Sequence, residues 1–273
     1  MSGNAVLTFE AQGERLVPAG RHPTLAAASA SLPEGAYTTL RTYGEKRLLR
    51  LDLHLRRLEE SVALQGRPGA VDRARVRGSL RAALDATAHP ESRLRLTFAP
   101  PRLFVSVESF TPPAARHYEE GVACTTVRVR RDNPHAKDTR FIATAQKAYG
   151  GLAPGVEEGL IVADDGAILE GLSSNFFAIA DGTLRTEEAR ALLGVTRSLV
   201  LEVAAALVPM EPRPILQREL PGVAEAFITS VSRGVLPVVR IDGQPVGDGR
   251  VGPRTRAIRD GFAALVEREA EPP

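Results

Sequence analysis

The stretch Ile168–Phe177 reads Ile-Leu-Glu-Gly-Leu-Ser-Ser-Asn-Phe-Phe, and it decides how the rest of the chain is interpreted. The segment begins with two apolar residues, followed by the carboxylate of Glu170. Small polar residues then lead to two phenylalanines. A plain hairpin would explain the segment, because Ser173, Ser174 and Asn175 can satisfy the backbone groups of a turn. A functional site would explain it equally well, so other segments have to separate the two interpretations.

A second informative segment lies at the start of a helix that we predict from Thr196 to about Leu207. Gly194 permits an unusual backbone angle there, and the amides of Val195 and Thr196 would stand free at the helix N-terminus. Free amides and the helix dipole together favour an anion. An ordinary N-cap by Thr196 is the alternative.

Lysine is rare in this sequence, and the only lysines are Lys46, Lys137 and Lys147. Chemistry that needs an amine nucleophile therefore has three candidates. Lys137 stands 33 residues before Glu170, Lys147 stands 23 residues before it, and Lys46 lies in the first half of the chain.

Taken together, these features resemble the class IV aminotransferases, enzymes of fold type IV that use pyridoxal 5′-phosphate. In that family a lysine carries the cofactor, and a glutamate at the spacing seen here holds the pyridine nitrogen. The resemblance implies that Lys137 is the catalytic lysine and that Glu170 is the partner of the pyridine nitrogen. The Glu-x-x-x-x-Asn-x-Phe motif of the family begins at Glu170, which implies cofactor contacts for Ser174 and Asn175.

The phosphate end of the cofactor is implied by three further matches. Gly194–Arg197 matches the Gly-Ile-Thr-Arg turn of the family and implies contacts from Val195 and Thr196. The segment Phe227–Val238 matches its second phosphate-side loop, and His54–Leu58 matches its His-x-x-Arg-Leu helix. These two matches imply phosphate donors at Thr229, Ser230, Val231 and Arg57.

The implied chemistry requires these residue types. A free amine can attack an aldehyde, and the same amine can later move a proton on the substrate. A carboxylate beside the pyridine nitrogen keeps that nitrogen protonated and strengthens the electron sink, which an Arg or His would not do.

One departure from the family concerns the phenolic oxygen of the cofactor. Branched-chain aminotransferases place a tyrosine five residues after the lysine, where this chain has Ile142. Some members keep an arginine seven residues before the lysine, so Arg130 is expected to make this contact. Other arginines nearby compete with it, namely Arg128, Arg131 and Arg140.

The substrate is expected to meet three residues of the first half. Tyr37 lies in Glu34–Leu40, which resembles the segment that lines the family's substrate pocket, although a core-facing tyrosine is an alternative. Arg93 and Arg95 are two apart on a predicted strand and share a face. Such a pair can hold a carboxylate in a bidentate grip, unless it forms an exposed charged face.

The predicted elements give an α+β chain with two domains. In the first half, the pattern predicts strands at Tyr37–Tyr43, Arg47–Leu51, Arg93–Ala99 and Leu103–Phe110, with helices at Asp52–Leu64 and Asp72–Ala86. In the second half, it predicts strands at Val122–Arg131, Leu160–Ala163, Phe176–Ala180, Ala226–Thr229 and Val235–Ile241, with helices at Thr196–Leu207 and Pro253–Glu267. Many strands and few helices there favour a barrel-like sheet over a doubly wound parallel one.

The resemblance implies that these elements form the two-domain fold of fold-type IV enzymes. A small N-terminal domain, α/β-sandwich-like, covers 1–112, a proline-containing linker covers 113–119, and a larger barrel-like cofactor domain covers 120–273. The resemblance also implies a homodimer.

Composition narrows the class of protein. The 273 residues carry a net charge of +2 and are 43% hydrophobic, which gives no reason to expect nucleic acid or a membrane as partner. The single Cys124 excludes an internal disulfide, and no metal site is expected. Met1–Asn4 lacks the pattern of an export signal, so a cytoplasmic location is expected.

The expected reaction is transfer of an amino group between an amino acid and a 2-oxo acid. The Ser173–Asn175 and Phe227–Val238 segments look most like D-amino-acid aminotransferases, so a D-amino acid is the favoured substrate. Transfer from a branched-chain L-amino acid is the alternative. A further alternative is aminodeoxychorismate lyase, which Gly35–Thr39 favours and the long Phe227–Pro253 pattern disfavours. A binding protein without cofactor is disfavoured because Lys137 and Glu170 are intact.

Overall fold

The computed structural model describes residues 5–13 and 15–273, so the prediction made on Met1–Asn4 lies outside the described residues. The chain divides into two compact units. Unit 1 holds Met1–Thr111, His135–Ala143 and Val266–Pro273, and unit 2 holds Pro112–Pro134 and Thr144–Leu265. The segment around Lys137 and the C-terminus thus group with the first unit, and helix α4 (Ala115–Glu119) lies in the expected linker.

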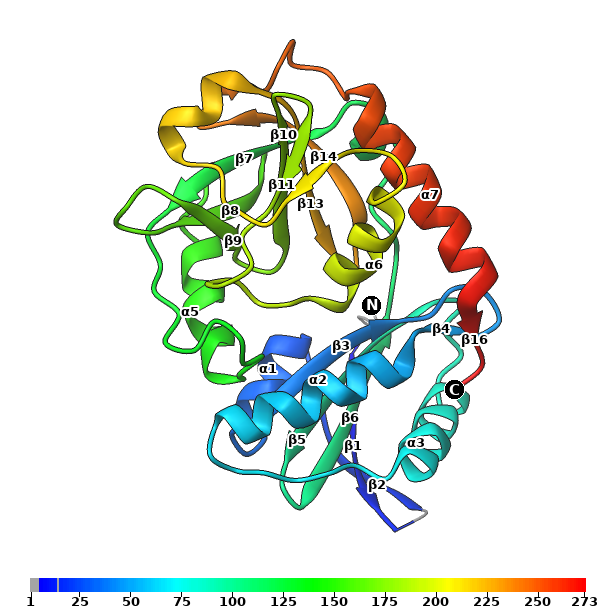
Figure 1. The fold of residues 1–273 in the computed structure, drawn as a ribbon. Coiled ribbons are helices and arrows are strands. Elements are labelled where there is room, and N and C mark those ends of the chain that lie inside the picture. Colours follow the sequence, from blue (N-terminus) through cyan, green and yellow to red (C-terminus); the bar gives the residue numbers. More distant parts are fainter. Residues whose placement is uncertain (1–4, 14) are drawn as a thin grey trace. The chain divides into compact units, whose positions relative to one another are not determined.

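Unit 1 is built on an antiparallel sheet of five strands, in the order β2-β1-β6-β5-β3. Helix α2 lies along this sheet, as Figure 1 shows. A short ribbon pairs β4 with β16 near the C-terminus. The bounds are β1 Val6–Gln12, β2 Arg15–His22, α1 Leu25–Ala30, β3 Ala36–Arg41, β4 Leu48–Leu49, α2 Leu51–Leu64, α3 Arg73–Asp85, β5 Ser92–Ala99, β6 Arg102–Ser109 and β16 Ala270–Glu271.

The apolar stripe of α2 explains why this helix packs on the sheet. Leu55, Leu58 and Val62 recur at helical spacing and are fully buried in the core of unit 1. Burial of one such side chain stabilises a fold by about 1.5–3 kcal/mol. Asp52, the first residue of the predicted helix, does not cap it: the N-cap is Arg50, in a left-handed conformation and without a side-chain cap, and Asp52 lies in the first turn.

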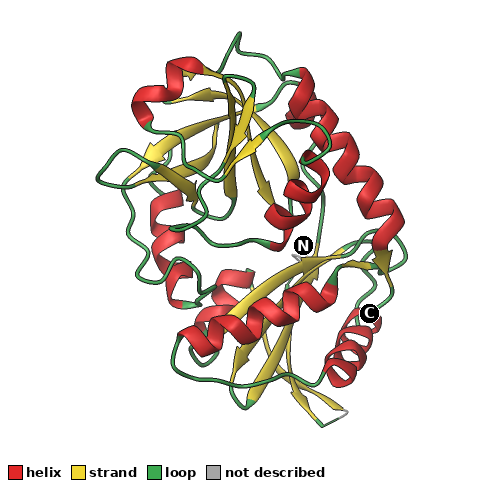
Figure 2. Ribbon diagram, in the orientation of Figure 1, coloured by secondary structure: helices red, strands yellow, loops and turns green. Residues whose placement is uncertain are grey.

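Unit 2 contains one mixed sheet of nine strands, in the order β12-β11-β10-β13-β14-β7-β8-β9, with β15 paired to β14. The strands curl into a half-barrel, drawn as yellow arrows in Figure 2. This confirms the predicted fold class. The bounds are β7 Val122–Val127, α5 Arg140–Tyr149, β8 Val156–Val162, β9 Ile168–Gly171, β10 Asn175–Ala180, β11 Thr183–Arg185, α6 Val195–Ala204, β12 Met210–Glu211, β13 Val223–Ser230, β14 Gly234–Ile241, β15 Gln244–Pro245 and α7 Pro253–Glu269, where α5 and α7 each have one end in unit 1.

Two hairpin turns of unit 2 are made by Asp-Gly dipeptides. Asp181-Gly182 and Asp242-Gly243 both have positive φ at each residue, as tight hairpin turns require. Among the described residues, no helix is long and apolar enough to cross a membrane.

Candidate active site

Hydrogen bonds of the Lys137 backbone hold this residue beside β3. Its carbonyl accepts from the amide of Tyr37 at 2.9 Å, and its amide donates to Ser61 Oγ at 3.1 Å. Thr139 adds a backbone bond to Gly35 O at 3.0 Å. These bonds bring the Lys137 Nζ to 4.8 Å from the ring centroid of Tyr37, so unit 1 does place the predicted lysine next to the predicted pocket tyrosine.

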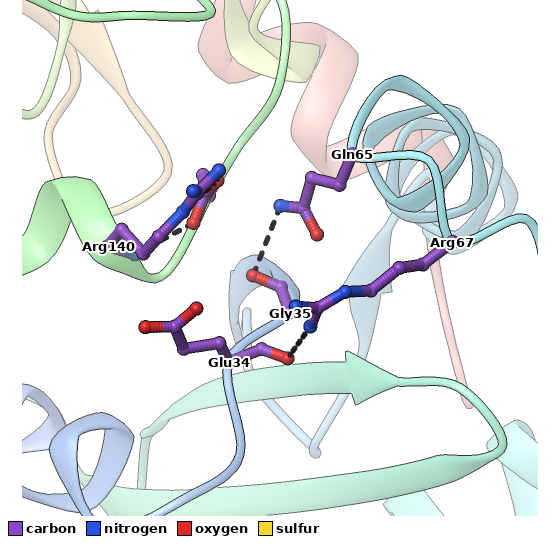
Figure 3. Close-up of a pocket in the computed structure, with 6 residues that line it drawn as sticks. Glu34, Gly35, Gln65, Arg67 and Arg140 are labelled. Atoms are coloured by element: carbon purple, nitrogen blue, oxygen red, sulfur yellow. Dashed lines mark hydrogen bonds and ion pairs between the residues drawn. The ribbon is translucent and has the colours of Figure 1, made fainter.

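A small polar pocket lies on the chain segments that carry this lysine (Figure 3). Gln65 donates to Gly35 O at 3.3 Å, and Arg67 donates to Glu34 O at 2.9 Å. Arg140 holds Asp138, the residue after the lysine, through its backbone amide and its guanidinium. The polar groups of this pocket therefore fix the backbone around Lys137.

Arg57 is buried and ordered by a short chain of side chains. Its Nη2 donates to Thr38 Oγ1 at 2.8 Å, and that oxygen lies 2.8 Å from Nδ1 of His54. A guanidinium only donates, so the threonine hydroxyl accepts from Arg57, and the tautomer of His54 decides whether the hydroxyl also donates to Nδ1 or accepts from it. Burial, followed by the charges of Arg57 and Lys137, holds the pKa of His54 well below its usual range. A neutral His54 thus orients the predicted phosphate arginine.

The two substrate arginines have different surroundings. Arg95 donates from Nη1 to Leu25 O at 3.0 Å and to Ser29 Oγ at 2.7 Å, and its guanidinium lies 4.7 Å from the Tyr37 ring centroid. Burial lowers the pKa of Arg95. Arg93 forms an ion pair with Glu108. Both arginines are on one face of β5, as expected, but only Arg95 contacts Tyr37.

In unit 2, Glu170 stands on β9 with its carboxylate buried. Oε1 accepts from Nη1 of Arg131 at 2.7 Å, and Oε2 accepts from the amide of Leu192 at 3.1 Å. Arg130, in contrast, has a side chain that is 93% exposed, with Asp132 at 3.8 Å. Its contact with the cofactor stays a prediction, whereas its neighbour Arg131 faces the predicted pyridine carboxylate.

The start of α6 is open, as an anion site requires. Its N-cap is Gly194 and no side chain caps it, so the alternative of an N-cap by Thr196 is excluded. Asn175 donates from Nδ2 to Leu192 O at 2.7 Å, and its Oδ1 closely approaches Gly194, where a Cβ would lie only 2.3 Å from that oxygen. Leu192 thereby connects the Glu170 carboxylate with the turn before α6.

The remaining predicted residues lie at the ends of β10 and β13. Thr229 pairs with Asn175 across the sheet and is followed by Ser230 and Val231, both half-buried. Ser174 is buried and donates from Oγ to Oε2 of Glu158 at 2.9 Å. Unit 2 therefore gathers Ser174, Asn175 and Thr229 at neighbouring strand ends.

The residues present fit a phosphorylated pyridine cofactor. The hydroxyl of Thr229 is buried and has no hydrogen-bond partner among the described residues. The N-terminal amides of α6 have no side-chain cap, and Glu170 supplies the anion that a protonated pyridine nitrogen needs. Among residues 5–13 and 15–273, no group of His, Cys, Asp and Glu side chains is arranged to hold a metal ion.

Sequence reasoning missed three residues that order this site: Arg131 as the partner of Glu170, and Glu158 and Arg233 beside Ser174. The sequence marks Arg131 only as a competitor of Arg130 for the phenolic oxygen of the cofactor. Glu158 gave no signal, because it stands in an ordinary strand sequence. Arg233 lies in the matched segment Phe227–Val238, but the match implied contacts only for Thr229, Ser230 and Val231.

Comparison with known proteins identifies the family to which this chain belongs. Residues 35–241 match the family described as amino-transferase class IV, and the chain therefore belongs to this family. The match confirms the family recognised from the sequence and, with it, the pyridoxal 5′-phosphate cofactor that these enzymes use.

Individual relatives point to two kinds of aminotransferase. D-alanine aminotransferase of Staphylococcus aureus (strain COL) is 36% identical over 103 residues, which cover 37% of this chain and 36% of that protein. Branched-chain-amino-acid aminotransferase of Pseudomonas aeruginosa is 28% identical over 161 residues, which cover 56% of this chain and 52% of that protein. The matches thus span about a third to a half of these relatives.

Solved structures share the fold along nearly the whole chain. The branched-chain amino acid aminotransferase of T.th., solved with pyridoxamine 5′-phosphate, superposes with a TM-score of 0.79 at 19% identity, covering 97% of this chain and 95% of that one. The branched-chain aminotransferase of Thermoproteus uzoniensis gives 0.78 at 22% identity, with 97% and 96% covered.

Proposed function

We propose that this chain is a pyridoxal 5′-phosphate-dependent aminotransferase that moves an amino group between an amino acid and a 2-oxo acid. The observation that carries the proposal is the buried Glu170 carboxylate, which shares Leu192 with the open turn before α6. When bound, the cofactor supplies the electron sink that stabilises negative charge at the substrate Cα. The protein's residues supply the rest of the chemistry.

Lys137 is the proposed catalytic residue. Its amine carries the cofactor and, once substrate has displaced it, moves the proton at the substrate Cα. The backbone bonds to Tyr37 and Ser61 fix the start of this side chain, and Tyr37 lies under its Nζ. Fixing the amine in this way reduces the entropy lost when the proton moves.

We propose that the residues predicted to contact the phosphate and the pyridine ring hold the cofactor in position. Glu170 keeps the pyridine nitrogen protonated, and the phosphate receives donors that are either backbone amides at a helix start or short hydroxyls. The proposed contacts are Glu170, Arg57, Ser174, Asn175, Val195, Thr196, Ser230 and Val231. Tyr37, Arg93 and Arg95 are proposed for the substrate.

A D-amino acid is the favoured substrate in this proposal, supported by the Ser173–Asn175 segment and by the D-alanine aminotransferase relative. A branched-chain L-amino acid is the second candidate, supported by the relatives of that name. A homodimer in the cytoplasm completes the proposal, and the solution mass of the holoenzyme tests the dimer.

A panel of mirror-image substrates tests the reaction. The holoenzyme is incubated with 2-oxoglutarate and either D-alanine, L-alanine, D-leucine or L-leucine, and the new 2-oxo acid is measured. We expect product from D-alanine above all. Product from L-leucine alone would favour the branched-chain function. Silence with all four, together with pyruvate released from aminodeoxychorismate, would contradict an aminotransferase and favour the lyase.

A further inference from the structure

The carboxylate of Glu158 on β8 is fully buried and receives five donors. Its Oε1 accepts from the hydroxyl of Tyr149 at 2.5 Å and from the amide of Gly159 at 3.1 Å. Its Oε2 accepts from Ser174 Oγ at 2.9 Å, Ser173 Oγ at 3.1 Å and Arg233 Nη1 at 2.9 Å. A buried charge with this many donors is both neutralised and fixed in orientation.

Arg233 is the only charged donor in this set. Its side chain is 15% exposed, and it also donates to Glu157 Oε1 at 3.0 Å and to Ser173 Oγ at 3.1 Å. The two carboxylates raise the pKa of Arg233, although its burial acts in the opposite direction. Burial and the charge of Glu158 likewise raise the pKa of Tyr149, so this hydroxyl keeps its proton and remains a donor.

The ion pair joins two turns that are far apart in sequence. The first is the tight turn Gly171–Ser174, closed by a bond from Gly171 N to Ser174 O at 2.8 Å, and it connects Glu170 directly to Asn175. The second is the turn Ser230–Gly234 between β13 and β14, closed by a bond from the Arg233 amide to Ser230 O at 3.2 Å.

The turn Gly171–Ser174 is also closely packed against Glu158. A Cβ at Gly171 would lie 2.2 Å from Ser174 Oγ and 2.9 Å from Glu158 Cγ. The glutamate therefore packs against the turn backbone as well as accepting from its serines. A shift of the Glu158 side chain would move the whole turn.

We infer that Glu158 and Arg233 are a positioning pair for the cofactor, holding the pyridine-side turn and the phosphate-side turn of unit 2 in one fixed arrangement. This inference rests on the proposed cofactor contacts of Glu170, Asn175, Ser230 and Val231. Neither residue of the pair contacts the reacting atoms. Around bound metal ions, removal of an outer hydrogen-bond partner changes the affinity by about 10–100-fold, and we expect an effect of the same order for the cofactor here.

The test measures binding of pyridoxal 5′-phosphate to the full-length apoprotein by absorbance titration. Arg233→Met leaves the Glu158 carboxylate buried without its cation, which can impair folding. The double variant Glu158→Gln/Arg233→Met removes both charges together and avoids this problem. Arg185→Met is the matched control, because the Arg185 side chain is 11% exposed and pairs with Glu211 on β12.

We expect the double variant to melt close to the control as apoprotein but to bind pyridoxal 5′-phosphate at least about tenfold more weakly than wild type. Arg185→Met is expected to bind it with wild-type affinity. Wild-type affinity in the double variant, or an equal loss in the control, would overturn the inference. A wild-type chain that does not bind pyridoxal 5′-phosphate would overturn the proposed function and the inference with it.

Discussion

The guanidinium of Arg131 donates to the carboxylate of Glu170 at 2.7 Å, with side chains only 10% and 4% exposed. Two oxygens of a carboxylate offer about four acceptor positions. Arg131 and the Leu192 amide take two of them, so Glu170 can accept a further donor without losing either. The pair therefore fixes the carboxylate in place and leaves it acceptor capacity for a pyridinium nitrogen.

Glu170→Gln tests the charge of this carboxylate. We expect kcat for amino transfer to fall on the order of 10²–10³-fold, as when one fixed electrostatic partner of a transition state is removed. Glu187→Gln is the control, because Glu187 is a similarly buried carboxylate that pairs with Arg190. Equal losses of kcat in both variants would contradict a specific role for Glu170.

Protonation of His54 gives a pH dependence of stability. The folded state holds the pKa of His54 well below the ordinary value of about 6.5, so the unfolded state binds the proton first as the pH falls. The free energy of unfolding is therefore unaffected by His54 above about pH 6.5. Below that pH it falls, by up to about 1.4 kcal/mol per pH unit.

His54→Asn removes the titrating group and keeps a side chain that can accept from or donate to the Thr38 hydroxyl. We expect the melting temperature of the variant to fall less than that of wild type between pH 7 and pH 5. Parallel falls in the two proteins would show that His54 does not titrate in this range.

Gly194→Ala tests the open turn before α6. Its φ of −66° suits alanine, but the new Cβ would lie 2.3 Å from Asn175 Oδ1. Overpacking of this kind costs about 1–3 kcal/mol. We expect weaker binding of pyridoxal 5′-phosphate, measured by titration, and unchanged binding in Gly222→Ala, where a Cβ meets nothing within 4 Å.

Arg95→Ala tests the substrate carboxylate. We expect KM for the amino acid to rise about tenfold or more with cofactor affinity retained, because a charge-assisted hydrogen bond is worth about 1.5–3 kcal/mol. A smaller rise is expected for Arg93→Ala, since Glu108 already neutralises Arg93. If Arg95 only supports α1 through Ser29, the melting temperature will fall while KM stays unchanged.

Local patterns predicted much of the fold, and the reasons are visible in particular elements. Helix α3 follows the predicted span Asp72–Ala86: Asp72 is its N-cap and accepts from the Arg75 amide, and Val76 and Leu80, one turn apart, are buried. In contrast, β2 was not predicted, because almost all of its residues are exposed and no alternation marks it. Helix α5 was also missed.

Site residues that belong to a sequence motif, or stand at a characteristic spacing, were predicted. Site residues that are brought together only by the register of the strands were missed. The predicted strand Val122–Arg131 ends at Val127, so no alternation fixed which side Arg130 and Arg131 would face. The bond between Glu158 and Arg233 joins residues 75 apart in sequence. Only the order of β14, β7 and β8 in the sheet brings them together.

Lys137 carries the cofactor in the proposed function, and the site of attachment can be measured directly. The holoenzyme is reduced with borohydride and digested, and the peptide that gains the pyridoxyl phosphate mass is identified by mass spectrometry. We expect the modification on Lys137 and none on Lys46 or Lys147, the only other lysines. Modification of Lys46 or Lys147 in place of Lys137 would contradict this expectation.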